Sequence, residues 1–381
     1  MLCDSGWTGT TGAGTVCVNP RDIDDILSGR RRDLFAHLLR TGTTLAEPFY
    51  RLGLNLHQSL YRCGLKSRHT VEVPVVSIGN LTTGGTGKTP FTARLVKLLI
   101  DQGLIPGIAS RGYRALKSED SQNIPANDEK LVLDLMCPRT PHRQNRDRVT
   151  AAQDLIIDHA DIILIDDGYQ HLRLKRDVDL VLIDAVNPFG YNHLLPRGLL
   201  REPLNALKRA HLIVITRTDQ ITQDQLAGIE HEVRRYTDVP IVHVHFAPTG
   251  WQDHRGNTVP ISESHQSAVV FCGIGNPEGF RQGLTKLGLE LNDQNWLVFP
   301  DHHHYTQDDL NQLAEVAKEH ANGRLVTTLK DLVKIRDLIP QGITCQALLI
   351  EAVIDSGEDV LIKTIQSKIK RELQMDADGR R

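Results

Sequence analysis

The sequence predicts an α/β protein made of two units, and three observations support this prediction. Short β-branched and aliphatic runs, typical of buried strands, alternate with segments in which apolar residues recur at helical spacing. A glycine-rich turn joins the first strand of this series, expected at 73–78, to the helix after it. Residues 247–267 contain several prolines and glycines, so we place a linker there, between a first unit at 71–246 and a second at 268–381.

The turn after the strand at 73–78 has the composition of a phosphate-binding loop. Its residues are Gly84, Gly85, Thr86, Gly87, Lys88 and Thr89. The glycines lack the Cβ atoms that would keep an anion from the backbone N–H groups, and the next helix adds partial positive charge at its N-terminus. The lysine supplies a full charge for the β- and γ-phosphates, and the following threonine supplies a hydroxyl for Mg²⁺. Although Thr82 stands where the strict pattern has glycine, the flanking strand and helix favour a nucleoside-triphosphate site, a P-loop.

Composition excludes several classes of protein. A chain of 381 residues with 40% hydrophobic and 24% charged residues can form two domains, each with its own core. A net charge of −3 argues against a general nucleic-acid-binding role. The six cysteines form no C-x-x-C pair, which fits a reducing compartment better than a disulfide framework or a zinc site. We also expect no membrane span and no signal peptide.

The N-terminal 70 residues contain a polar segment and then an amphipathic one. Residues 1–28 are rich in glycine and threonine, so we expect them to be disordered. Residues 29–70 are expected to form helices, with an interruption near Pro48. Their apolar stripe consists of Leu34, Leu38, Leu45, Phe49, Leu52, Leu56 and Leu60. Eight basic residues against two acids between positions 30 and 70 favour contact with an anionic membrane surface, but a helix that packs its leucines on the core remains an alternative.

Two aspartates follow the buried strand that is expected at 162–165. Asp166 and Asp167 stand where an acidic residue can hold Mg²⁺ opposite the phosphate loop. Gln170 and His171 come soon after them, and His171 is either a supporting residue or an ordinary turn residue. The two halves of a Mg-nucleotide site therefore occur in the expected order.

Polar residues also follow the strand expected at 105–110. Arg111 and Tyr113 stand at the carboxyl end of this strand, where ligands bind in open α/β sheets. Asp128 and Glu129 then open a helix expected at 130–136, where the ordinary interpretation is a helix cap. A stretch at 138–148 carries four arginines that either meet phosphate or lie in solvent.

Two further loops have open interpretations. Arg201 and Glu202 lie between breakers at 195–203, in a loop held near an anionic ligand or in an ordinary surface pair. Arg217 follows a strand at 211–216, at the place where a lysine followed two residues later by an aspartate would indicate guanine recognition.

The second unit is expected to contain strands at 268–273, 296–300, 325–328 and 347–350 with helices between them. Its most unusual segment is Asp301-His302-His303-His304-Tyr305. Adjacent side chains point in different directions, so one histidine oriented by an acid is a better interpretation than a zinc site. The pair Gly273 and Gly275 lacks the third glycine of a dinucleotide loop.

Taken together, the motifs resemble those of the tetraacyldisaccharide 4′-kinase family, the lipid A 4′-kinases. The blocks that carry the resemblance span about 34–352 and are GNLTTGGTGKTP, SRGY, DDGYQH, LPRGLLREP, CGIGNP, FPDHHHY and TTLKD. The family implies a P-loop NTPase-type three-layer α/β/α core domain, joined by a β-stranded linker to a smaller α/β domain. It also implies transfer of phosphate from ATP to the 4′-hydroxyl of a tetraacyl glucosamine disaccharide 1-phosphate, at the cytoplasmic face of the bacterial inner membrane.

The resemblance also implies residue roles. Lys88 and Thr89 would contact phosphate and Mg²⁺, Asp166 and Asp167 would hold the metal, and Glu129 would support the Mg-nucleotide. Asp128 would accept or orient the proton of the sugar hydroxyl, assisted by His302. The substrate side would include Arg111, Tyr113, Gln170, His171, Arg201 and Glu202. The blocks depart from the family pattern at Asn127, Arg114, Lys130 and Leu329.

We expect a monomeric, peripheral membrane enzyme that uses ATP and Mg²⁺ and binds no nucleic acid. One alternative is a GTP-dependent metallochaperone or cofactor-insertion protein on the same P-loop fold, which would recruit Cys137 and the histidine cluster. Another is a membrane scaffold that binds nucleotide and lipid without consuming either.

Overall fold

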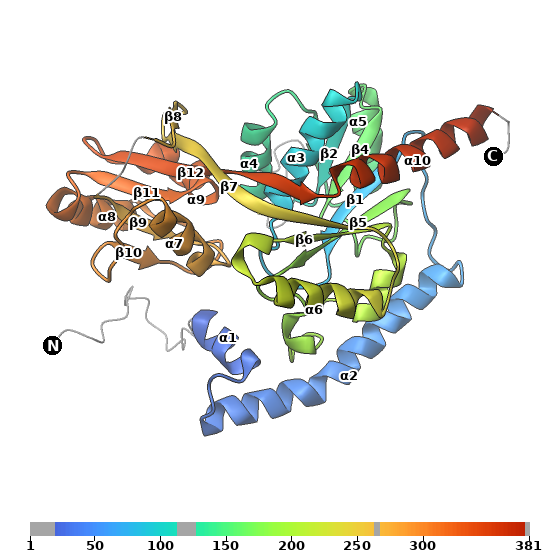
Figure 1. Cartoon of the computed structure of the whole chain (residues 1–381), viewed down its shortest axis with the longest axis horizontal. Helices are drawn as coiled ribbons and strands as arrows, with labels where there is room; N and C mark the ends of the chain where they lie inside the picture. The colour runs from blue at the N-terminus through green and yellow to red at the C-terminus, as the bar shows by residue number, and fades with distance from the viewer. Residues whose placement is uncertain (1–19, 113–126, 263–266, 378–381) are drawn as a thin grey trace, which may run out of the picture.

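The computed structural model describes residues 20–112, 127–262 and 267–377. Its strands form one continuous sheet in the order β10-β9-β11-β12-β7-β6-β5-β1-β4-β2-β3, and β8 pairs with β7 alone (Figure 1). The strands of the first unit are β1 (Val75–Asn80), β2 (Pro106–Ser110), β3 (His142–Gln144), β4 (Ile162–Asp166), β5 (Val178–Asp184) and β6 (Leu212–Thr216). Neighbours among these six strands are parallel. The central strand β1 is buried along its length, as the continuous apolar runs predict.

Helices cover both faces of this first sheet region, so the predicted three-layer α/β/α core is confirmed. The helices concerned are α3 (Lys88–Asp101), α4 (Asp128–Met136), α5 (Arg148–Ile157), α6 (Gln223–Arg234) and α10 (Glu358–Ala377). On one face, Phe91 and Leu95 of α3 pack with Leu361 of α10 in one apolar cluster. Separate clusters on α5 and α6 bury other residues of the same strands. The last helix therefore returns to the first core instead of staying with residues 268–356, which differs from the unit expected at 268–381.

Two long antiparallel strands connect the two units. β7 (Ile241–Asp253) pairs with β12 (Thr344–Ser356) along almost the full length of both strands. Residues 247–253, which the sequence places in the linker, belong to β7, because this strand continues through Pro248. A register shift between Leu349 and Ile350 leaves Thr249 without a partner beside that proline, which is how a sheet accommodates a residue without an N–H donor. The linker is thus β-stranded, as the resemblance implies.

The second unit extends the sheet beyond β12. Its strands are β8 (Thr258–Pro260), β9 (Val269–Cys272), β10 (Trp296–Val298) and β11 (Arg324–Thr328), and its helices are α7 (Pro277–Lys286), α8 (Gln307–His320) and α9 (Leu329–Ile335). Phe271 and Leu310 belong to a core cluster of this unit. Helix α9 packs against α4 of the first unit, so the two units meet beside the N-terminus of α4.

The N-terminal helices lie along the outside of the first unit (Figure 1). The expectation of disorder over 1–28 is wrong for its last nine residues, which form α1 (Pro20–Ser28) with Ile26 fully buried; residues 1–19 lie outside the described residues. α2 (Leu34–Arg62) is one helix of 29 residues that includes Pro48, so the predicted interruption is also wrong. Tyr50 and Leu54 on its inner face pack on the core of the first unit. The leucines of the predicted apolar stripe are not part of this contact.

Candidate active site

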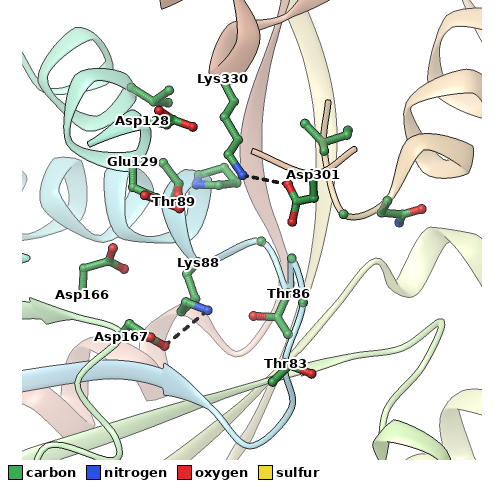
Figure 2. Close-up of a pocket in the computed structure, with 18 of the residues that line it drawn as sticks. Thr83, Thr86, Lys88, Thr89, Asp128, Glu129, Asp166, Asp167, Asp301 and Lys330 are labelled. Atoms are coloured by element: carbon green, nitrogen blue, oxygen red, sulfur yellow. Dashed lines mark hydrogen bonds and ion pairs between the residues drawn. The ribbon is translucent and has the colours of Figure 1, made fainter. Parts of the chain in front are cut away.

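The phosphate loop joins the end of β1 to the first turn of α3. Gly87 has φ +81, and a Cβ placed there would lie 2.1 Å from Cζ of Phe246. Only glycine satisfies both constraints, which explains this position of the motif in physical terms. The loop from Gly84 to Thr89 lines one large cavity (Figure 2).

The end of β6 holds the loop in place. The Thr216 hydroxyl donates to the carbonyl oxygen of Thr86 at 3.0 Å, and Arg217 donates to the carbonyl oxygen of Gly85 at 2.7 Å. The C=O of Thr86 and the N–H of Gly87 belong to one trans peptide group and point in opposite directions. Because this C=O faces β6, the N–H of Gly87 is turned away from β6. Arg217 also pairs with Asp184. Its guanidinium is therefore engaged in supporting the loop, which accounts for an arginine where a guanine site would have lysine.

Lys88 lies between the loop and the two aspartates. Its Nζ is 3.1 Å from Oδ1 of Asn80 and 3.5 Å from Oδ1 of Asp167. Arg201 donates to both carboxylate oxygens of Asp167, at 3.0 and 2.9 Å. Burial alone would raise the pKa of Asp167, but Lys88 and Arg201 outweigh it and hold the pKa at about 2. The structure therefore brings together the cation and the acid that the motifs predict at this site.

Asp166 has a different environment from its neighbour. It is buried at the end of β4, and its Oδ1 has no hydrogen-bond partner. Burial raises its pKa to about 6, although Lys88 acts in the opposite direction. A buried carboxylate oxygen without a partner is costly, and divalent cations such as Mg²⁺ take oxygen ligands. These residues fit a Mg²⁺ ion held together with nucleotide phosphates.

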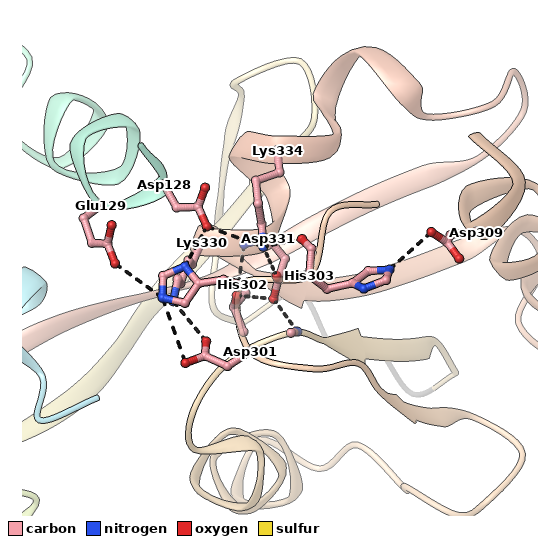
Figure 3. Close-up of polar contacts among 11 residues, drawn as sticks. Asp128, Glu129, Asp301, His302, His303, Asp309, Lys330, Asp331 and Lys334 are labelled. Atoms are coloured by element: carbon pink, nitrogen blue, oxygen red, sulfur yellow. Dashed lines mark hydrogen bonds and ion pairs between the residues drawn. The ribbon is translucent and has the colours of Figure 1, made fainter. Parts of the chain in front are cut away.

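The second half of the site comes from the N-terminus of α4. The side chain of Asn127 accepts from the backbone N–H of Lys130 at 2.9 Å and caps this helix, so the cap interpretation of Asp128 and Glu129 is wrong. Both carboxylates lie close to His302 (Figure 3). His302 Nδ1 is 3.3 Å from Oδ2 of Asp128, and Nε2 is 3.8 Å from Oε1 of Glu129.

The backbone and charge of His302 are both unusual. Its φ of +59 is uncommon for a residue with a Cβ, and such strain is concentrated at functional positions. The hydrogen bond with Asp128 raises the pKa of His302 above its ordinary value. Burial raises the pKa of Asp128, but His302 and the nearby lysines outweigh burial, so the pKa lies below its ordinary value. The pair is therefore a carboxylate held beside a basic imidazole, with each side chain supplied by a different unit.

The residues expected on the substrate side line the same cavity. Glu202 is buried and accepts from Arg209 at 2.7 and 3.0 Å, from Gln170 at 3.1 Å and from Gln58 of α2 at 2.8 Å. Arg201 pairs with Asp167 and Glu202 pairs with Arg209, so the alternative of an ordinary surface pair of Arg201 with Glu202 is wrong. Arg111 also lines the cavity, whereas Tyr113 lies outside the described residues.

His171 also lines this cavity, and its environment is strongly cationic. Burial lowers its pKa to about 4, and Arg148 and Arg176 add to the effect. Arg148, from the stretch of four arginines, is itself buried beside the cavity, and burial lowers its pKa to about 10. His171 is therefore neutral at pH 7.

Sequence reasoning missed several residues at the site. Tyr50 of α2 donates to the carbonyl oxygen of Arg201 at 3.0 Å, which brings α2 onto the substrate side. Lys330 lies 3.3 Å from Nε2 of His302 and 3.2 Å from Oδ1 of Asp301, and Lys334 lies 3.7 Å from Oδ2 of Asp128 (Figure 3). The TTLKD block, which contains Lys330, was the only sequence signal near the two lysines.

Comparisons with known proteins agree with this geometry. A family model described as tetraacyldisaccharide-1-P 4′-kinase matches residues 43–370. A tetraacyldisaccharide 4′-kinase of Elusimicrobium minutum is 36% identical over 314 residues, which cover 77% of this chain and 83% of that protein. One from an Anaeromyxobacter species is 34% identical over 362 residues, which cover 92% of this chain and 97% of that protein.

A solved structure agrees as well. The crystal structure of an LpxK from Aquifex aeolicus in complex with ATP matches with a TM-score of 0.67 and 25% identity, and the match covers 87% of this chain and 99% of that one. These matches do not favour the metallochaperone alternative. The chain therefore belongs to the tetraacyldisaccharide 4′-kinase family, and the predicted lipid A 4′-kinase, with its ATP-dependent phosphotransfer, is confirmed.

Proposed function

We propose that this protein transfers the γ-phosphate of ATP to the 4′-hydroxyl of a tetraacylated glucosamine disaccharide 1-phosphate, and that the residues described above carry out the transfer. One observation carries the proposal: Lys88 with its two aspartates and Asp128 with His302 line a single cavity. A phosphate donor and a hydroxyl acceptor must meet within one such site. The names of the relatives identify the acceptor as a tetraacyldisaccharide.

In this proposal the first unit binds the nucleotide. The loop from Gly84 to Gly87 and Lys88 hold the β- and γ-phosphates, and Glu129 supports the nucleotide from α4. Thr89, Asp166 and Asp167 hold Mg²⁺, which would neutralise part of the charge on the phosphates. The unpartnered Oδ1 of Asp166 supports this assignment.

The acceptor hydroxyl is assigned to Asp128. A sugar hydroxyl hardly ionises at neutral pH, so a carboxylate within hydrogen-bond reach promotes its attack on phosphorus. The lowered pKa of Asp128 keeps this carboxylate ionised, and His302 orients it from the second unit. Arg111, Gln170, His171, Arg201 and Glu202 line the side of the cavity on which the sugar and its phosphate would lie, and Tyr113 is proposed to join them.

We also propose that α2 rests on the cytoplasmic face of the bacterial inner membrane. Leu45, Phe49, Leu52 and Leu56 are 69%, 76%, 66% and 62% exposed, so the alternative in which these residues pack on the core is wrong. An exposed apolar stripe on a basic helix fits an interface with anionic lipid. Among the helices of the described ranges, none is long and apolar enough to cross a bilayer. The protein then acts as a peripheral monomer that takes its lipid substrate from the bilayer surface.

Product analysis tests the function. The protein is incubated with ATP, Mg²⁺ and the lipid disaccharide monophosphate, and the lipid is examined by mass spectrometry and ³¹P NMR. We expect a doubly phosphorylated lipid whose new phosphate is on the 4′-oxygen. Nucleotide hydrolysis without a doubly phosphorylated lipid would contradict the proposal and favour the metallochaperone alternative. Binding of nucleotide and lipid with neither consumed would contradict it in favour of the scaffold.

A further inference from the structure

We propose that Lys334 is a positioning residue for Asp128 and that the buried Asp331 of the TTLKD block holds it in place. The inference rests on the proposed function, because it concerns the carboxylate assigned to the acceptor hydroxyl. It gives a role to a sequence block that the nucleotide and acceptor residues leave unexplained.

Asp331 is fixed at the N-terminus of α9. It is fully buried, and its Oδ2 accepts from the backbone N–H of Gly273 at 3.0 Å and from the hydroxyl of Thr328 at 2.7 Å. Its other oxygen, Oδ1, lies 2.9 Å from Nζ of Lys334, one helical turn later. A buried carboxylate held by two donors is a rigid anchor, so the position of the lysine is also restricted.

Lys334 has little freedom to move elsewhere. Its side chain is only 10% exposed, and its Nζ donates to the carbonyl oxygen of His303 at 3.2 Å. The ammonium also lies 5.1 Å from the centre of the Tyr305 ring, within the range of a cation–π contact. Three groups of the second unit thus hold this cation in place, independently of its contact with the first unit.

The remaining contact of the ammonium crosses to the first unit. Nζ of Lys334 lies 3.7 Å from Oδ2 of Asp128, the same oxygen that lies 3.3 Å from Nδ1 of His302 (Figure 3). Lys334 and His302 therefore act on the same oxygen, which leaves Oδ1 of Asp128 for the acceptor hydroxyl. Helix α9 packs on α4, so this contact is part of the interface between the two units.

This arrangement has a defined consequence for the transfer step. As the sugar oxygen bonds to the γ-phosphorus and the bond to the β–γ bridging oxygen breaks, the hydroxyl proton passes to Oδ1 of Asp128 and ADP leaves. Lys334 takes no proton in this step. It keeps the carboxylate in the rotamer that presents Oδ1, and misplacement of a reacting group by about 1 Å can cost up to about 100-fold in rate.

The test compares Lys334→Met, Lys334→Arg and the same changes in an Asp128→Asn background. In the intact protein we expect Lys334→Met to lower kcat by about 10-fold or more, with the Kd of ATP within about twofold, because the lysine does not contact the nucleotide loop. Lys334→Arg should recover part of kcat. In the Asp128→Asn background Lys334→Met should have almost no further effect, because the lysine acts through that carboxylate.

The controls separate this role from a merely structural one. Thermal unfolding of each variant reports any loss of stability that results from leaving Asp331 without its partner. The double variant that combines Asp331→Asn with Lys334→Met removes the unpaired charge. If kcat is unchanged in Lys334→Met, or if its loss is equally large in the Asp128→Asn background, the inference is overturned while the kinase function stands. If the unmodified protein forms no doubly phosphorylated lipid, the proposed function fails, and the role of Lys334 fails with it.

Discussion

The phosphate loop and the Asp128–His302 pair are built in different ways. The loop is fixed by Thr216 at the end of β6 and by Arg217 directly after it, both of the same unit, and the Lys88 side chain is only 15% exposed. The pair instead joins side chains 174 positions apart in two units, and the His302 side chain is 41% exposed. The loop proposed to bind nucleotide is therefore held by its own unit, whereas the proposed activation of the acceptor depends on the contact between α4 and the second unit.

The largest effect on the nucleotide side should come from Lys88→Ala. Loss of this cation removes a full charge from the phosphate site and leaves Asp167 with Arg201 alone, so the affinity for ATP should fall by about 100-fold. Calorimetric titration with ATP measures it. Lys97→Ala is the matched control, because this lysine pairs with Glu351 on the exposed side of the same helix. Nearly equal ATP affinities for the two variants would contradict a role for Lys88 in binding the nucleotide.

Helix α2 is a third region with a separate expected role, because it should act on lipid and not on nucleotide. Phe49→Glu places a charge on the apolar stripe, and binding to vesicles that contain anionic lipid should fall by about 30-fold, with the Kd of ATP unchanged. Vesicle sedimentation measures this binding. Ile157→Glu is the control, since this residue is 75% exposed on α5, which lies apart from α2 (Figure 1). Equal losses in both variants would contradict a specific role for α2.

Gly87→Ala tests whether the loop is held by its own unit. The change strains a residue at φ +81 and collides with the Phe246 ring, so we expect about a 10-fold loss of ATP affinity. Adding Phe246→Ala relieves the collision but not the strain, and should restore only part of the affinity. Gly228→Ala in α6 meets no atom within 4 Å and serves as control. ATP binding by Gly87→Ala at full affinity would show that the loop adapts more freely than this geometry allows.

The smallest effect concerns stability and His171. Its pKa in the folded protein, about 4, lies below the ordinary value near 6.5, so the unfolded chain takes up a proton that the folded protein excludes. The stabilisation is present above pH 6.5 and is lost as the pH falls towards 4. Because the ring is partly exposed, we expect the free energy of unfolding to fall between pH 7 and pH 5 by about 1 kcal/mol more than in His171→Gln. Urea unfolding at both pH values measures this difference, and parallel behaviour of the two proteins would remove the evidence for a neutral His171.

Local patterns predicted the first unit well because its elements are defined by neighbouring residues. The strand before the loop starts at Val75 instead of residue 73, and the predicted helix after the loop is α3. Long-range pairing could not be predicted in this way. The pairing of β7 with β12 past Pro248 and the return of Leu361 to the first core leave no local signature, because both join residues more than 90 positions apart.

Contacts between residues far apart in the sequence also explain which parts of the site could not be predicted. The acids and cations of the first unit follow their own strands and were predicted, with roles that remain proposals. Lys334 escaped prediction because its spacing from Asp331 is ordinary for any helix. Only the packing of α9 on α4 brings it to Asp128. Chemistry shared between two units is therefore the part of the site that local sequence patterns predict least.

One variant tests the division between the two halves most directly. Asp128→Ala is compared with the unmodified protein for its Kd for ATP and for its kcat with the lipid disaccharide monophosphate. Removal of the acceptor carboxylate should lower kcat by about 10³-fold while the Kd for ATP stays within about twofold. Parallel losses of ATP affinity and turnover would contradict the account and would place Asp128 among the nucleotide-binding residues.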